Sequence, residues 1–310
     1  MTLTRLTAAL VATALMVSSP AGSATSLSIL FIGNSFTFAA GSPVHYYRAD
    51  TVTDLNGEGI GGVPALFESF TRQAGLDYEV SLETRGGSGL DFHLAEKADV
   101  IGRRGWDKVV MHGYSTLDSA KPRDPAKLIA TSARMAALLR QKNPKVEIYL
   151  MSTWSRADQV YPAAGAWAGT AIGVMARDVR AAYDKAAAEA AATAVLPVGE
   201  AWIRAIDAGI ADANPYDGID AGKVDLWTYD HYHGSTYGYY LEALVIFGGI
   251  TGRDPRSLGA AECSGFELGL SRAQVTALQQ VAFDQLAVAG TIKAAPSAST
   301  ATPARCNAGG

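Results

Sequence analysis

The fold is decided by residues 27–37, LSILFIGNSFT. Residues 29–32 form a continuous apolar run, which ends at Gly33. A run of this kind predicts a strand that is buried on both faces, as in a parallel sheet covered by helices. Ser35 comes directly after that strand, and open α/β sheets form their sites at the carboxyl ends of strands. We therefore expect Ser35 to face a crevice, although Gly33-Asn34-Ser35 taken alone would also suit an ordinary turn.

A second informative stretch, Asp230-His231-Tyr232-His233, lies towards the other end of the chain. Asp230 precedes His233 by three residues, so its carboxylate can fix the tautomer of the imidazole, whose other nitrogen would then face a serine. Together with Ser35, these two residues supply the side chains of a Ser-His-Asp triad.

At this pairing the chain resembles the SGNH, or GDSL-like, serine hydrolases. That superfamily carries its nucleophile on a Gly-Asp-Ser or Gly-Asn-Ser turn after the first strand, and the rest of the triad in a C-terminal Asp-x-x-His. The matching segments here are Gly33-Asn34-Ser35 and Asp230-x-x-His233, and the resemblance extends from about residue 26 to residue 258. It implies that Ser35 is the nucleophile, that His233 is the base, and that Asp230 orients the base.

Strand and helix patterns alternate along the rest of the chain. Further strands are expected at residues 78–84, 106–111, 146–151 and 194–197, and helices at 63–74, 124–142, 170–193, 199–208 and 270–286. This alternation predicts an α/β fold: a three-layer α/β/α sandwich with a parallel, flavodoxin-like sheet of five strands. Residues 36–62 show no regular period, and we expect them to form a long loop beside Ser35.

The resemblance also implies an oxyanion hole with donors from three blocks of sequence. The backbone N–H of Ser35 is one donor, and the N–H of Gly87, in a glycine-rich turn, is the second. The third block of the superfamily usually reads Gly-x-Asn, whereas this chain has His112-Gly113-Tyr114-Ser115. The alignment gives Ser115 the place of the asparagine, and His112 is the alternative donor.

The composition favours one exported globular domain. At 310 residues with 48% hydrophobic content the chain can bury a sizeable core, and its net charge of −4 argues against a nucleic-acid partner. Residues 1–24 have the basic start, apolar centre and small-residue end of a signal peptide, which predicts a secreted or periplasmic protein. Residues 25–293 are the expected hydrolase domain, and residues 294–310 are a low-complexity tail. No other stretch is long and apolar enough for stable insertion into a membrane.

The chain has two cysteines, Cys263 and Cys306. In an exported protein such a pair predicts one disulfide. The disulfide would hold the tail against the domain.

These features predict an exported serine esterase that hydrolyses carboxylic esters through an acyl-enzyme, with a small-molecule or saccharide ester, such as an acetylated carbohydrate, as substrate. The chemistry calls for no metal and no organic cofactor. Three alternatives remain. An α/β-hydrolase would use Ser115, but its Gly-x-Ser-x-Gly elbow needs glycine where Leu117 stands. A metal-binding protein would use Asp230, His231 and His233, and a non-catalytic carbohydrate-binding or surface protein would retain only the fold.

Overall fold

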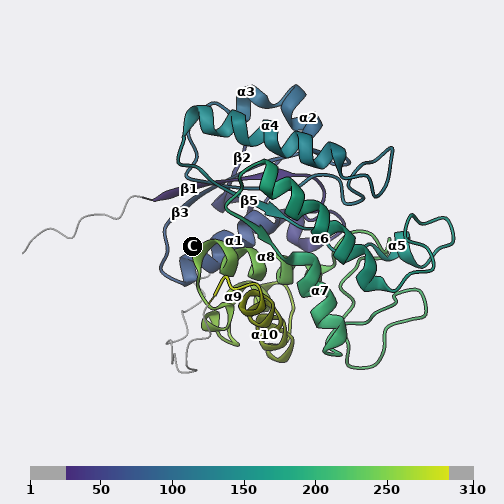
Figure 1. The fold of residues 1–310 in the computed structure, drawn as a ribbon. Helices are drawn as coiled ribbons and strands as arrows, with labels where there is room; N and C mark the ends of the chain where they lie inside the picture. The colour runs from purple at the N-terminus through teal and green to yellow at the C-terminus, as the bar shows by residue number, and fades with distance from the viewer. Residues whose placement is uncertain (1–25, 293–310) are drawn as a thin grey trace, which may run out of the picture.

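Six strands form one parallel sheet in the computed structural model, which describes residues 26–292 (Figure 1). The strands are β1 (Leu27–Gly33), β2 (Thr53–Asp54), β3 (Tyr78–Thr84), β4 (Lys108–Met111), β5 (Glu147–Met151) and β6 (Ala194–Leu196). Their order is β2-β3-β1-β4-β5-β6, so β1 lies inside the sheet with β3 on one side and β4 on the other. The predicted parallel α/β fold is confirmed.

The prediction of five strands is wrong, because β2 is a sixth. It has only two residues, which pair with Ser81 and Leu82 of β3 at the edge of the sheet. It lies within residues 36–62, which also contain the 3-10 helices η1 (Pro43–Tyr46) and η2 (Ala49–Thr51). A two-residue strand is too short to show a period of two, and it exists because a neighbouring strand offers it hydrogen bonds.

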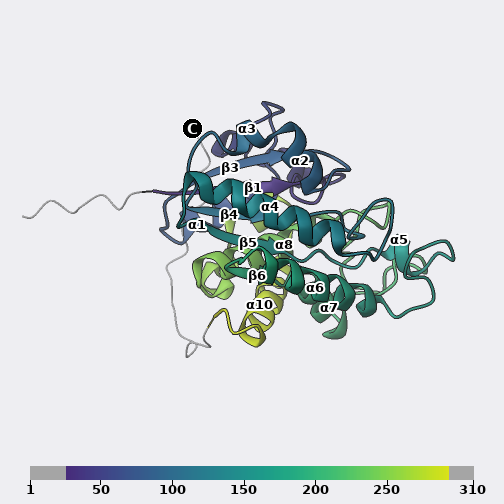
Figure 2. The ribbon, with the colours of Figure 1, turned by 45° about the horizontal axis from the view of Figure 1, so that its top comes forward.

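Helices cover both faces of the sheet, because successive residues of β1 point to opposite sides. Ile29 and Phe31 pack with one helical layer, and Leu30 and Ile32 pack with the other. The first layer contains α1 (Gly62–Gln73), α7 (Val198–Asp207), α8 (Thr236–Thr251) and α10 (Arg272–Val288), and the second contains α2 (Leu90–Glu96), α3 (Ala98–Ile101), α4 (Ala126–Lys142) and α6 (Ile172–Glu189) (Figure 2). The arrangement is the predicted three-layer sandwich.

Helix α8 begins directly after the Asp-x-x-His segment and anchors it. The hydroxyl of Ser235 accepts hydrogen bonds from the backbone N–H groups of Tyr237 and Gly238, so Ser235 is the N-cap. A Cβ atom on Gly238 would lie 2.4 Å from the carbonyl oxygen of Leu226 and 2.5 Å from the ring of Trp202. Only glycine fits there, and the start of α8 therefore packs tightly under the loop that it follows.

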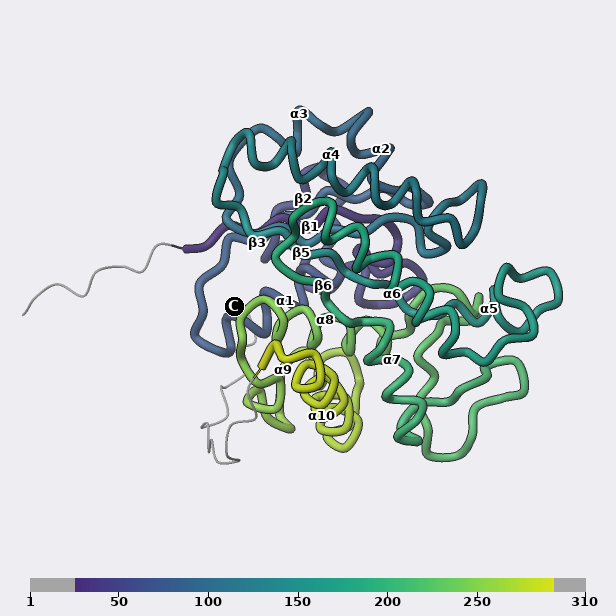
Figure 3. Tube along the Cα trace, viewed as in Figure 1, coloured from purple at the N-terminus to yellow at the C-terminus, as the bar shows by residue number. Residues whose placement is uncertain are grey.

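The segment around α5 (Ala157–Val160) and the loop of residues 208–235 extend on the same side of the molecule (Figure 3). The indole N–H of Trp154 donates to the carbonyl oxygen of Tyr232 at 3.2 Å, and the indole N–H of Trp227 donates to that of Ser155 at 3.0 Å. These contacts join the chain that follows β5 to the Asp-x-x-His segment.

Several sequence predictions lie outside the described residues: the signal peptide of residues 1–24 and the tail of residues 294–310, which contains Cys306. The Cys263–Cys306 disulfide therefore stays a prediction, with Cys263 buried at the start of α9 (Cys263–Glu267). Within residues 26–292, the longest and most apolar helices fall short of what a membrane span requires.

Candidate active site

The turn after β1 is held by the side chain of Asn34. Its amide nitrogen donates to the carbonyl oxygens of Ser88 at 2.9 Å and Gly113 at 3.2 Å, and its amide oxygen accepts from the N–H of Phe36 at 3.1 Å. Ser88 follows β3 and Gly113 follows β4, so one buried amide joins the ends of three neighbouring strands. Ser35 lies on this turn and is 6% exposed.

Gly33 is required by close packing rather than by an unusual backbone angle. A Cβ atom at Gly33 would lie 2.2 Å from the hydroxyl oxygen of Thr37 and 2.4 Å from Nε2 of His112. These two atoms are themselves hydrogen bonded at 2.8 Å. Glycine at the end of β1 therefore makes room for a Thr37–His112 pair directly beneath the turn that carries Ser35.

His112 is buried and has no N–H group to offer to a substrate. Burial lowers its pKa to about 4, so the ring is neutral at pH 7 and carries one N–H. Nδ1 lies 3.0 Å from the carbonyl oxygen of Gly113, which can only accept, so the hydrogen is on Nδ1. Nε2 must then accept from the hydroxyl of Thr37. Of the two candidates for the third oxyanion donor, this arrangement favours Ser115 over His112.

Asp230 and His233 form a hydrogen-bonded pair, with Oδ2 of Asp230 2.6 Å from Nδ1 of His233. Its other carboxylate oxygen accepts from the hydroxyl of Thr228 at 2.8 Å and from the backbone N–H groups of Tyr232 and His233 at 3.0 and 2.9 Å. Partial burial alone would raise the pKa of the Asp230 carboxyl, but the hydrogen bonds from His233 and Thr228 hold it well below its usual range. Asp230 is therefore ionised at neutral pH and keeps the Nδ1 hydrogen on the imidazole.

Aromatic contacts bring the turn that carries Ser35 close to the loop that carries Asp230 and His233. The ring of Phe36, the residue after Ser35, lies 5.9 Å from the imidazole of His233 and 5.4 Å from the ring of Tyr232, measured between centroids. The same ring stacks on Trp154 at 3.8 Å. The structure thus places the Ser35 turn beside the loop that carries Asp230 and His233, although some 200 residues separate them in sequence.

Gly87 and Ser115 line one hollow of about 250 Å³. Gly87 has φ +68°, a conformation that glycine adopts without strain. Among residues 26–292, no atom outside Gly87 and its two chain neighbours lies within 4 Å of the position its Cβ would take. The space beside its backbone is therefore open. The other lining residues are Asn34, Tyr114, Thr116, Ser119, Pro122, Arg156, Gln159 and Tyr232.

Sequence reasoning missed three side chains in this region. It read Asn34 only as part of a motif, and it did not single out Thr228 or Arg156 at all. Arg156 donates from Nη1 to the hydroxyl oxygen of Ser115 at 3.3 Å, and Thr228 contacts Asp230. Thr228 could have been suggested by its place two residues before Asp230, whereas no local pattern links Arg156 to Ser115.

The geometry around Ser115 differs from a nucleophile elbow. That motif holds its serine on a sharp turn between a strand and the helix that follows it. Here β4 ends at Met111, and α4 does not begin until Ala126. Ser115 instead lies in a turn within the long connection of residues 112–125, with Arg156 against its hydroxyl oxygen.

The histidines of the proposed metal site are not gathered around one point. Within residues 26–292, no group of three or more His, Cys, Asp or Glu side chains is placed to hold a metal ion. The ring of His231 lies 4.2 Å from that of Tyr216, while His233 is paired with Asp230.

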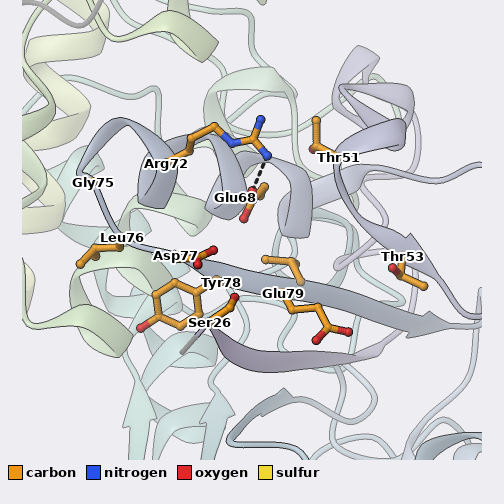
Figure 4. A pocket seen from close by; sticks show the side chains of 11 residues that line it. Ser26, Thr51, Thr53, Glu68, Arg72, Gly75, Leu76, Asp77, Tyr78 and Glu79 are labelled. Atoms are coloured by element: carbon orange, nitrogen blue, oxygen red, sulfur yellow. Dashed lines mark hydrogen bonds and ion pairs between the residues drawn. The ribbon is translucent and has the colours of Figure 1, made fainter. Parts of the chain in front are cut away.

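A separate hollow of about 460 Å³ lies between α1 and the first residues of β3 (Figure 4). Glu68 and Arg72 of α1 form an ion pair at its edge, and Asp77, Tyr78 and Glu79 line its other side. This hollow is at the amino-terminal edge of the sheet. Sites of open parallel sheets form at the opposite edge, and none of the predicted site residues lines this one.

No protein-family model and no curated protein matches the sequence. Solved structures do match it. A DUF4886 family protein from Bacteroides uniformis has a TM-score of 0.62 at 17% identity, over 87% of this chain and 98% of its own. A protein proposed to be an SGNH hydrolase, from Slackia heliotrinireducens, has a TM-score of 0.51 at 21% identity, over 73% of this chain and 100% of its own.

A protein proposed to be a GDSL-like lipase, from Parabacteroides merdae, has a TM-score of 0.50 at 15% identity, over 73% of this chain and 95% of its own. At these identities the likeness is one of fold. The chain has the fold of the SGNH hydrolases.

Proposed function

We propose that the protein is a serine esterase that uses Ser35, His233 and Asp230. The observation that carries this proposal is the Asp230–His233 pair, whose imidazole packs on Phe36, the residue next to Ser35. Because Asp230 accepts from Nδ1 of His233, Nε2 is the imidazole nitrogen that is left to act as a base. The fold shared with the SGNH hydrolases supports the same proposal.

In the proposed reaction, Nε2 of His233 takes the proton of Ser35 as its oxygen attacks the ester carbonyl. The N–H groups of Ser35 and Gly87 stabilise the resulting oxyanion. His233 then gives its proton to the leaving alcohol, and an acyl group remains on Ser35. A water molecule, deprotonated by His233, hydrolyses that acyl-enzyme and releases the acid.

The size and lining of the hollow beside Gly87 favour a short acyl group. Its volume is about 250 Å³, and most of its lining side chains carry hydroxyl, amide or guanidinium groups, as Ser115, Gln159 and Arg156 do. A long hydrocarbon chain would find little apolar surface there. An acetyl group is small enough and needs no extended apolar wall.

A second hollow, of about 430 Å³, is lined by Arg85 and Gly86 of the same glycine-rich turn, and its side chains suit a hydroxylated alcohol. It is lined by Phe38, His45, Tyr46, Glu58, Ile60, Arg85 and Gly86. Tyr46 is 71% exposed, and the C–H faces of a sugar ring can pack on such a ring. Among the described residues, Arg85 and Glu58 form no ion pair, so both can hydrogen bond hydroxyl groups. We therefore propose an acetylated saccharide as the substrate.

The proposed place of action is outside the cytoplasm. Residues 1–24 have the pattern of a signal peptide. A mature protein that still begins at Met1, when its mass is measured after expression in a secreting host, would contradict this part.

Labelling with a fluorophosphonate probe tests the nucleophile, because only an activated serine reacts with it. We expect the labelled peptide to contain Ser35 and the Ser35→Ala variant to remain unlabelled. A label on Ser115 would support the α/β-hydrolase alternative. A folded wild-type protein that takes no label but binds acetylated oligosaccharides would be a non-catalytic binding protein.

Kinetics of Tyr46→Ala test the saccharide. We expect the variant to raise KM for an acetylated oligosaccharide several-fold and to leave both constants for p-nitrophenyl acetate unchanged. The control is Phe266→Ala on α9, which removes a ring that is 78% exposed and lines neither hollow. Equal effects of Tyr46→Ala on both substrates would contradict the proposed sugar contact.

A further inference from the structure

The hydroxyl oxygen of Ser115 already accepts a hydrogen bond, whereas the hydroxyl hydrogen has no acceptor among residues 26–292. Its oxygen accepts a hydrogen bond from Nη1 of Arg156 at 3.3 Å, and among residues 26–292 the hydroxyl donates to no protein atom. A serine hydroxyl has one hydrogen and can rotate it towards any acceptor. The oxygen of Ser115 accepts from the Arg156 guanidinium through one lone pair. Its hydrogen is therefore left to be donated to an acceptor in the hollow that Ser115 shares with Gly87.

The guanidinium of Arg156 is fixed on several sides. Its Nε and Nη2 atoms donate to the two carboxylate oxygens of Asp158 at 2.9 and 2.5 Å. The group lies over the ring of Tyr232, 3.5 Å from the centroid, and the side chain is 14% exposed. Nη1 is the guanidinium nitrogen that faces Ser115. Because Asp158 holds the other two nitrogens, the position of Nη1 is fixed although the arginine side chain is long.

The same contacts attach Arg156 to the loop of the proposed base. The ring of Tyr232 lies 4.0 Å from the imidazole of His233, measured between centroids. The backbone N–H of Asp158 donates to the carbonyl oxygen of His231 at 3.2 Å. Arg156 therefore bridges the chain after β4, which carries Ser115, and the Asp-x-x-His loop, and it lines the hollow between them.

We propose that Ser115 and Arg156 act together as the third oxyanion donor. This inference rests on the proposed esterase function. The hydroxyl of Ser115 is the catalytic group that donates to the oxyanion, and Arg156 is a positioning residue that acts through it. Accepting a hydrogen bond from a cation polarises the hydroxyl and makes its own hydrogen a stronger donor. Ser115 and Arg156 together take the place of the asparagine amide in the superfamily pattern. This chain departs from that pattern by having Ser115 at the asparagine position.

The magnitude expected follows from other oxyanion holes, where removing one donor lowers kcat by about 10²–10³. We expect Ser115→Ala to lower kcat for p-nitrophenyl acetate by about 10², with KM changed little, because the interaction exists only in the transition state. Arg156→Met keeps the length of the side chain and removes its charge. It should lower kcat by a similar factor.

A double-mutant cycle tests whether Arg156 acts through Ser115. If it does, kcat of the double variant, Ser115→Ala with Arg156→Met, should lie within a few-fold of kcat of either single variant. If the two factors multiply, Arg156 acts independently of Ser115 and the inference is overturned. Arg156→Lys retains a cation and should keep more of kcat than Arg156→Met, whereas equal losses in the two variants would also contradict it.

Arg256→Met is a matched control. Arg256 is paired through several hydrogen bonds with Asp254, two residues away, and its guanidinium lies 3.3 Å from the centroid of Phe283, yet it lines neither hollow beside the glycine turn. Arg256→Met should leave kcat unchanged. Urea unfolding of each variant monitors folding, and if Arg156→Met does not fold, Arg156→Lys and Ser115→Ala complete the cycle.

A failure of this inference is distinguishable from a failure of the proposed function. If Ser35→Ala is inactive while Arg156→Met keeps full kcat, the proposed esterase function is supported and the proposed role of Arg156 is wrong. If Ser35→Ala keeps its activity, both are wrong. The Ser115→Asn variant gives a more specific test. An asparagine amide donates a hydrogen bond without help from Arg156, so adding Arg156→Met to Ser115→Asn should lower kcat little.

Discussion

The described part of this chain contains two carboxylate–histidine pairs, and they differ in almost every respect. Asp230 and His233 are on a loop, with their side chains 30% and 16% exposed. Glu83 and His93 form the second pair through Oε2 and Nδ1, and both side chains are 0% exposed. Nε2 of His93 lies 3.3 Å from the hydroxyl oxygen of Ser88.

The direction of the hydrogen bonds separates the two arrangements. The hydroxyl of Ser88 donates its one hydrogen to the nearer acceptor, the carbonyl oxygen of Arg85 at 2.8 Å, so that hydrogen is not held by Nε2 of His93 at 3.3 Å. A nucleophile requires the reverse, a histidine nitrogen that accepts. The buried pair therefore contacts the glycine-rich turn of residues 85–89 as a support, and the proposed proton transfer uses the loop pair. A carboxylate, a histidine and a serine in sequence do not by themselves make a catalytic triad.

The largest expected effect tests this contrast at the serines. Ser35→Ala should lower kcat by about 10⁴–10⁶, because the nucleophile is lost. Ser88→Ala should stay within about tenfold of wild type, because Ser88 only supports the turn. Initial rates on p-nitrophenyl acetate measure both. A larger loss in Ser88→Ala than in Ser35→Ala would reverse the assignment of the two pairs.

The next effect concerns the carboxylates. Asp230→Asn should lower kcat by about 10⁴, as the wrong tautomer of the histidine is then stabilised. Its cost in folding free energy should be smaller than that of leaving a fully buried charge unpaired, because the side chain is partly exposed and an asparagine oxygen can still accept hydrogen bonds. Rates and urea unfolding on the same preparation check both statements, and a fully active Asp230→Asn variant would remove Asp230 from the site.

The buried pair should show the opposite behaviour. His93→Phe leaves the carboxylate of Glu83 buried without its partner, and we expect a loss of about 3–5 kcal/mol in the free energy of unfolding. Replacing both residues, by Glu83→Met with His93→Phe, should recover part of that loss. Urea unfolding measures the three variants. Full stability of His93→Phe alone would show that the pair is not structural.

A pH-dependent effect comes from a third carboxyl group, Glu242 of α8, which is 1% exposed and has no hydrogen-bond partner among the described residues. Burial raises its pKa well above the usual range. The native state then keeps a proton that the unfolded chain releases above about pH 4.3. Stability is therefore lost as pH rises from there through the folded pKa, by up to about 1.4 kcal/mol per pH unit.

Glu242→Gln tests that slope, because an amide does not titrate. The free energy of unfolding of the wild type should fall more between pH 5 and pH 8 than that of the variant. Parallel pH dependences would show that Glu242 is not protonated in the native state. Asp230 provides the contrast, since a lowered pKa makes its contribution present at neutral pH and lost only in strong acid.

Local sequence determined the parts of the protein that depend on neighbouring residues. The apolar run of residues 29–32 predicted an interior strand, and the regular alternation predicted the parallel sandwich. The pairing of Asp230 with His233 followed from a spacing of three residues, which a single turn of chain closes. Ser35 could be placed at the carboxyl edge because that edge follows from the strand itself.

Only the tertiary structure decided what depends on residues far apart in the chain. Strand β2 exists through its pairing with β3, and His112 lacks a free N–H because Thr37 and Gly113 occupy both of its nitrogens. Arg156 meets Ser115 across 41 residues, and no local period encodes that contact. A hydrogen bond of this kind depends on the packing of the whole sandwich, which sets distances that sequence spacing alone does not contain.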